Sequence, residues 1–154
     1  PDGDLSVDGV TGTAMLIDRD KLKLINDWDT NIFNYFEDMD LCIRFRLNGF
    51  EIVKIRNSEV DHDAFASHDL AISEAMDFSR NWHYSWSRIY FLKKHTSYMN
   101  AINKGLKLFI NSFVKSLFYS LFKRSKAITH FAKAYGALFS ILNLKPNYRP
   151  KIKL

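Results

Sequence analysis

The stretch NYFEDMDLCIRFRLNGFEIVKIR, residues 34–56, predicts a helix that is followed directly by a strand. The helix is expected from Glu37 to Leu47, because the pair Asn48-Gly49 is a typical signal for a helix end. The segment FEIVKIR, residues 50–56, then alternates apolar and polar positions as a strand does. This helix and strand form the best-defined local prediction in the chain.

Three carboxylates, Glu37, Asp38 and Asp40, stand at the start of the predicted helix. At about 100° per residue, Cys42 lies within roughly 40° of Asp38, so we expect Asp38 to lead the buried stripe and face a cleft. Asp40 is expected to point the opposite way, where Arg44 at position i+4 can form a surface ion pair with it. The alternative is that these acids only stabilise the first turn of a helix, and it stays open.

Two further polar residues are candidates for binding chemistry. His62 lies between Asp61 and Asp63 at the end of the strand-like segment, and an imidazole nitrogen there suits a divalent metal. A histidine in a loop can equally face solvent. Arg80 is able to bind a phosphate with two hydrogen bonds, and an exposed ion pair is the competing interpretation.

The remaining elements are predicted from periodicity and from turn residues. Residues 1–12 are rich in Gly and Asp and predict a loop. The others are a short buried strand at Ala14–Ile17, one or two helical turns at 18–25, and helices at about 70–95, from 106 onward and at 128–142, before Pro146 and Pro150 end the regular structure.

Charge is distributed unevenly along the 154 residues. The chain has 22 basic and 17 acidic residues, and no Asp or Glu occurs from Lys104 to the end. A basic segment of this kind favours an anionic partner such as a membrane surface or nucleic acid. Its basic residues alternate with a continuous apolar face, which argues against nucleic acid. The single cysteine, Cys42, excludes an internal disulfide and favours a reducing, cytoplasmic setting.

The apolar helices after residue 104 have two interpretations. Leu106–Phe122 is interrupted by lysines and is a poor candidate for a membrane span. The helices instead fit in-plane attachment to an anionic membrane, with Phe and Leu inserted and Lys at the headgroups. Packing on the core or on another copy is the equal alternative. The first interpretation predicts a cytoplasmic protein that is peripheral on the inner face of the cell membrane.

Taken in order, the motifs resemble one large family. They are GVTGTAMLI at 9–17, Trp28-Asp29, IFNYFEDMDLCIR at 32–44, Asn48-Gly49-Phe50, Val60-Asp61-His62 and Ser67. This order is similar to the C-terminal half of inverting, GT-A-type family 2 glycosyltransferases, close to the rhamnosyltransferase-like branch, and the resemblance covers about residues 7–96.

The resemblance implies an α/β fold. Residues 1–96 would be the C-terminal portion of a GT-A nucleotide-diphospho-sugar transferase domain, and residues 97–154 a helical, basic amphipathic extension. The implied activity is transfer of a sugar, with inversion, from a nucleotide-diphosphate donor to the hydroxyl of a glycan or lipid-linked acceptor in cell-surface polysaccharide synthesis. The rival hypothesis is a non-catalytic membrane-surface binding module whose acidic cluster only caps a helix.

The resemblance also assigns roles to residues. Asp38 would be the general base, and His62 would contribute to a divalent metal site, Mg or Mn, that also binds the diphosphate. Glu37 and Asp40 would orient the acceptor or brace the helix, and Gly12 would let the backbone approach the substrate. The other expected substrate-binding residues are Trp28, Asp29, Ser67 and Arg80.

Two departures from the family pattern limit what the chain can do. Asn26-Asp27-Trp28-Asp29-Thr30 stands where the family has Gly-Gly-Phe-Asp-Glu, and the missing glutamate puts an acceptor-side contact in doubt but not the base. The nucleotide-binding half with its D-x-D motif is missing. We therefore expect this chain to be a fragment that does not turn over by itself.

Overall fold

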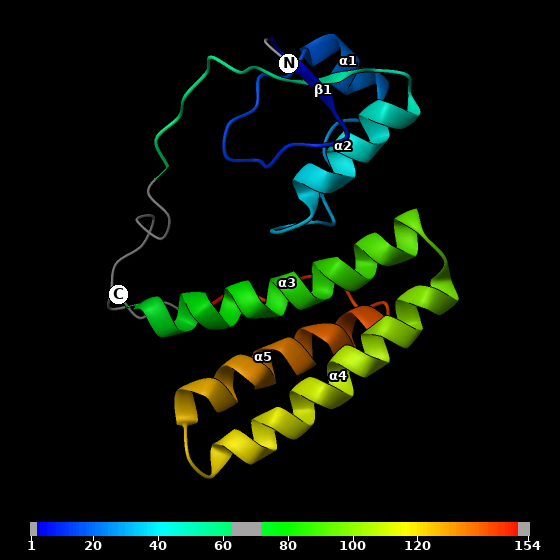
Figure 1. Cartoon of the computed structure of the whole chain (residues 1–154). Coiled ribbons are helices and arrows are strands. Elements are labelled where there is room, and N and C mark those ends of the chain that lie inside the picture. Colours follow the sequence, from blue (N-terminus) through cyan, green and yellow to red (C-terminus); the bar gives the residue numbers. More distant parts are fainter. Residues whose placement is uncertain (1–2, 63–71, 151–154) are drawn as a thin grey trace. The chain divides into compact units, whose positions relative to one another are not determined.

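The computed structural model describes residues 3–62 and 72–150 of the chain (Figure 1). Among these residues there are five helices and one two-stranded sheet. They form two compact units, the first made of residues 3–30 and 36–62 and the second of residues 31–35 and 72–150. Each unit is described by itself.

The first unit combines a small sheet with two helices. Strand β1 (Leu5–Val7) pairs antiparallel with β2 (Ile52–Lys54). Helix α1 (Arg19–Leu24) begins at Asp18, whose carboxylate accepts hydrogen bonds from two backbone N–H groups of the first turn. Helix α2 (Glu37–Leu47) has the predicted bounds, and Gly49 adopts the left-handed conformation (φ 79°) that commonly follows a helix.

The expected α/β fold of GT-A type is wrong for the part of the chain that the structure describes. The two strands there have three residues each, they run antiparallel, and helices make up most of the rest. The predicted buried strand at Ala14–Ile17 is an irregular segment, and Leu16 within it is 99% exposed. A parallel sheet requires several strands joined by crossover helices, and these residues supply no such neighbours for Ala14–Ile17.

The second unit is built from three long helices. Helix α5 (Arg124–Ile141) packs against both α3 (Ser73–His95) and α4 (Tyr98–Ser120). The buried residues of α5 are small, so the helix axes approach closely: Ala127, Ala132, Ala134, Gly136, Ala137 and Ser140. At Gly136, an added Cβ would lie 2.2 Å from the backbone oxygen of Trp82 on α3.

The residues after α5 return along α3 and complete the core of this unit. Trp86 Nε1 donates to the carbonyl oxygen of Leu144 (2.9 Å), and the ring of Tyr148 stacks on Trp82. His83 is fully buried, and its Nε2 donates to the carbonyl oxygen of Tyr148 at 3.0 Å. Burial lowers the pKa of His83, which favours the neutral imidazole in the core.

The predicted division of the chain at residue 96 stays a prediction. Helix α3 belongs to the same compact unit as α4 and α5, against which it packs. The second unit also contains residues 31–35, where the carbonyl oxygen of Asn34 accepts a hydrogen bond from Ser87 Oγ on α3 (2.8 Å).

Candidate functional site

Asp38 lies in the first turn of α2 and has both carboxylate oxygens fixed by backbone donors. The N–H of Gly12 donates to Oδ2 at 2.9 Å, and the N–H of Met39 donates to Oδ1 at 2.7 Å. Asp38 is half-buried, so its carboxylate is both held and accessible. The structure thus brings together two residues that the sequence assigned to the same site, although they are 26 positions apart.

The loop at residues 9–12 packs along the face of α2 that carries Asp38. Cys42, one turn further along α2, is buried, and its Sγ lies 3.8 Å from the carbonyl oxygen of Val10. A Cβ on Gly9 would be 3.4 Å from Cys42 Cβ, and one on Gly12 would be 3.5 Å from Asp38 Cβ. These are ordinary contact distances, so the contribution of Gly12 is its backbone N–H rather than the space left by a missing side chain.

Asp40 is the most deeply buried acid of the cluster, and the expectation that it points outward is wrong. It is 0% exposed and accepts a 2.8 Å ion-pair hydrogen bond from Arg44 Nε, as the i+4 spacing predicts. Arg44 Nη1 also donates to the carbonyl oxygens of Ile25 (2.7 Å) and Asp27 (2.6 Å). The orientation differs from expectation because α2 is covered on two sides, by the loop at 9–12 and by the turn after α1.

Arg44 therefore connects α2 to the turn that carries two other candidates, Trp28 and Asp29. Asn26 and Asp27 in this turn have positive φ values of 64° and 55°. The two carbonyl contacts of Arg44 hold the turn in this conformation. Trp28 is exposed and Asp29 is half-buried, so Asp40 and Arg44 fix the backbone from which these side chains extend.

Glu37 is half-buried beside Asp38, and its Oε2 is buried without a hydrogen-bond partner. Desolvation raises the pKa of this carboxyl, its own backbone N–H opposes that shift, and the neighbouring charge of Asp38 adds to it. A carboxyl with a raised pKa in the folded state binds its proton more tightly there than in the unfolded chain. The ionised carboxylate of Glu37 therefore lowers the free energy of unfolding at neutral pH.

The variant Glu37→Gln is expected to be more stable than the parent at pH 7 and to lose this advantage as the pH falls. The reason is that the destabilising contribution is present above the folded pKa of Glu37 and disappears once the carboxyl is protonated in both states. Urea unfolding of parent and variant at a series of pH values measures the difference. A stability difference that does not change with pH would contradict this account.

The remaining candidates are not brought to Asp38 within one unit. Arg80 lies on α3 in the second unit, where its Nη1 forms a 3.1 Å ion pair with Asp77 one turn earlier. An ion pair was the competing interpretation of Arg80 in the sequence, although its side chain is mostly buried rather than exposed. His62 is exposed in the segment after β2, and Ser67 lies outside the described residues.

The metal site expected at His62 stays a prediction, because its neighbour Asp63 lies outside the described residues. Within residues 3–62 and 72–150, no three His, Cys, Asp or Glu side chains lie close enough to hold a metal ion.

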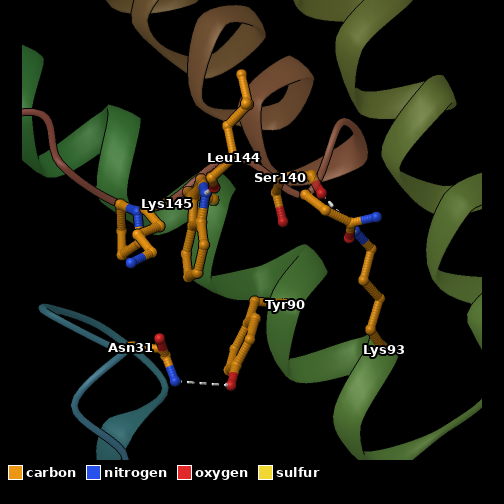
Figure 2. Close-up of a pocket in the computed structure, with 9 residues that line it drawn as sticks. Asn31, Tyr90, Lys93, Ser140, Leu144 and Lys145 are labelled. Atoms are coloured by element: carbon orange, nitrogen blue, oxygen red, sulfur yellow. Dashed lines mark hydrogen bonds between the residues drawn. The ribbon is translucent and has the colours of Figure 1, made fainter.

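A pocket of about 170 Å³ lies in the second unit, between α3 and the chain that follows α5 (Figure 2). Tyr90 stacks on Trp86 in its wall, and Asn31 Nδ2 donates to the Tyr90 hydroxyl at 3.3 Å. Lys93 Nζ donates to the Ser140 carbonyl oxygen and to Asn143 Oδ1, and burial lowers the pKa of this amine.

The sequence did not indicate this pocket. The contacts of Lys93 show that its amine satisfies polar groups at the end of α5, which is a structural role. Asn143, which has a positive φ of 57°, and Pro146 were the available signals that the chain turns here.

Comparison with known protein families, curated proteins and solved structures finds no match to this chain. Within the described helices, none is both long and apolar enough to cross a membrane.

Proposed function

We propose that this chain supplies the acceptor side of an inverting glycosyltransferase, with Asp38 as the general base. The observation that carries the proposal is the fixed and accessible carboxylate of Asp38, held by the backbone N–H groups of Gly12 and Met39. A general base must be placed within hydrogen-bond reach of the hydroxyl from which it takes a proton. The family motif around Asp38 supports the same role.

The carboxylate retains the capacity to act as a base in this arrangement. Each oxygen has two lone pairs and accepts one backbone hydrogen bond in these contacts, so lone pairs remain for an acceptor hydroxyl. In the proposed step, the hydroxyl oxygen bonds to the anomeric carbon of a nucleotide-diphosphate sugar. The bond from that carbon to the diphosphate breaks, and the hydroxyl proton passes to Asp38.

The other residues of the unit have supporting roles in the proposal. Asp40 and Arg44 are positioning residues, because their ion pair holds α2 against the turn after α1. Trp28 and Asp29 extend from that turn as acceptor-binding candidates. Binding of the nucleotide-sugar donor is assigned to residues other than those described.

The test is the variant Asp38→Asn in the polypeptide encoded by the complete reading frame. Sugar transfer to a polysaccharide or lipid-linked acceptor is expected to fall about 100-fold to 10,000-fold, because an amide does not accept the proton. Circular dichroism is expected to be unchanged, since the amide oxygen can still accept a backbone hydrogen bond. Transfer at the parent rate by this variant would refute the role of base.

Gly12→Ala is the matched control for this site. It keeps the N–H that donates to Asp38, and the added Cβ meets only an ordinary contact of 3.5 Å. Transfer by this variant is expected to stay close to the parent rate. Donor hydrolysis without acceptor should be measured alongside, since it separates loss of the base from loss of donor binding.

The alternative function is a non-catalytic module in which Asp38 only stabilises the start of α2. The specific observation in its favour is the contact with the N–H of Met39, which is one of the unsatisfied donors of the first turn. Under this alternative, Asp38→Ala would cost about 1 kcal/mol of stability and would leave any transfer activity unchanged. The contact with Gly12 is not explained by capping, because Gly12 belongs to a separate loop.

A further inference from the structure

Helix α4 exposes most of its large apolar side chains, while Ile102, Leu108 and Phe109 are half-buried. The exposed residues recur at intervals of three and four, which places them on one face of the helix and at its C-terminal end. We call this surface the α4 outer face: Leu106, Ile110, Phe113, Val114, Leu117, Phe118, Leu121 and Phe122.

The side of α4 that is buried carries small residues instead. Ala101, Gly105 and Ser112 are its buried residues. A helix on the surface of a water-soluble unit normally buries its large apolar residues and exposes polar ones. Small residues between helices and large apolar residues outside are typical of helices in contact with lipid. A contiguous exposed apolar surface of this kind marks an interaction site.

Basic residues border the α4 outer face. At about 100° per residue, Lys104 and Lys115 lie along one edge of the apolar stripe, between it and the buried side, and Lys107 lies within the stripe itself. Beyond the C-terminal end of the helix, Lys123, Arg124 and Lys126 are exposed next to Leu121 and Phe122, which are 75% and 72% exposed. No acidic residue follows Lys104 in the sequence.

We infer that the α4 outer face docks in the plane of an anionic lipid surface, with its apolar side chains inserted and its lysines at the headgroups. The end of α4 and the turn into α5 provide the deepest insertion, because exposed Phe and Leu side chains and three cations coincide there. This inference goes beyond the proposed function, since it stands on the second unit alone, and it would place the acceptor-side unit at a membrane.

Charge complementarity favours lipid over a second copy of the chain. Two outer faces brought together would also bring together two sets of lysines, with no carboxylate from this region to offset them. An anionic headgroup layer attracts the same lysines, and each lysine near the surface raises the binding constant about fivefold. The apolar stripe distinguishes the surface from one that follows a nucleic acid backbone.

The test is flotation of the full chain with vesicles of phosphatidylcholine mixed with phosphatidylglycerol, and with vesicles of phosphatidylcholine alone. The parent is expected to float with the anionic vesicles and to lose most of that binding in high salt. Leu117→Ser with Leu121→Ser is expected to weaken binding at least about tenfold. Lys123→Gln with Lys126→Gln is expected to weaken it by about 25-fold at low salt, from two lysines at fivefold each.

Matched controls come from exposed positions elsewhere in the same unit. Leu142→Ser removes an exposed leucine beyond the end of α5, and Arg88→Gln removes an exposed cation from α3. Neither is expected to change flotation. Because all the substituted side chains are exposed, circular dichroism should be the same for every variant.

Three results would overturn the inference. The first two are equal binding to both kinds of vesicle and no binding to either. The third is a parent that is dimeric by light scattering while the Leu117→Ser, Leu121→Ser variant is monomeric, which would assign the face to a second copy. Asp38→Asn is expected to float like the parent, so loss of transfer and loss of membrane binding are distinguished.

Discussion

The variant Gly136→Ala is expected to destabilise the second unit by about 3 kcal/mol. Its added Cβ would lie 2.2 Å from the carbonyl oxygen of Trp82 and 2.9 Å from the carbonyl carbon. Both are backbone atoms of α3, so no side-chain rotation relieves the clash and the two helices must separate. Separation of the helices would also disrupt the packing of Trp82, which lies in the core cluster with Trp86 and Ala132.

Gly105→Ala is the control for this prediction, because it makes the same chemical change in a neighbouring helix. Its Cβ would lie 3.1 Å from Ile141 Cγ1 and from Ile89 Cδ1, which are side-chain atoms able to move. The gain in helix propensity of about 1 kcal/mol offsets the crowding, so little change is expected.

Amide hydrogen exchange in α3 and α5 measures the loss of stability in both glycine variants, since it reports the opening free energy of each segment separately. Faster exchange in Gly136→Ala, with near-parent exchange in Gly105→Ala, is the expected result. Equal effects from the two variants would mean that the α3 and α5 backbones are not in contact at Gly136.

Arg44→Met is expected to cost the first unit about 3 to 5 kcal/mol. Asp40 is 0% exposed, and the variant removes the guanidinium that faces its carboxylate at 2.8 Å. The carbonyl oxygens of Ile25 and Asp27 lose a donor in the same variant. Hydrogen exchange in α2 is again the measurement.

The double variant Asp40→Leu with Arg44→Met separates the causes. Replacing both members of a buried ion pair by apolar residues removes the uncompensated charge, so much of the lost stability is expected to return. Arg46→Met is the surface control. Arg46 forms an ion pair with the exposed Asp8 over 3.8 Å, and exposed pairs of this kind contribute less than about 1 kcal/mol to stability. A double variant as unstable as Arg44→Met would show that the carbonyl contacts, rather than the charge, account for the loss.

Local patterns predicted the helices well. The bounds of α2 were predicted from the helical pattern and from Asn48-Gly49. Helices α3 and α5 lie close to the predicted ranges, whereas α4 begins at Tyr98, well before the predicted start at Leu106. The fold class was predicted incorrectly because the family resemblance supplied it. Strand pairing depends on neighbours in space, and in the described residues β1 and β2 have only each other.

The candidate site was predicted in part. Sequence placed Asp38 and Gly12 in one site, and the 2.9 Å hydrogen bond between them agrees with that grouping, while the catalytic role stays a proposal. Helical geometry assigned the wrong exposure to Asp40, because a helical projection cannot show that a second segment covers the opposite face. Arg80 was a candidate because a guanidinium can bind a phosphate, and the structure pairs it with Asp77 in the second unit.

What the sequence determined by itself is local: the bounds of α2, which acid can pair with Arg44, and where positive charge accumulates without carboxylates. Periodicity also found the apolar stripe of α4. Only the tertiary structure decided which side of α4 is buried, since Ala101, Gly105 and Ser112 allow close packing that Leu and Phe would prevent. Hydrophobicity identifies a face, but the space between neighbouring backbones determines whether that face turns inward.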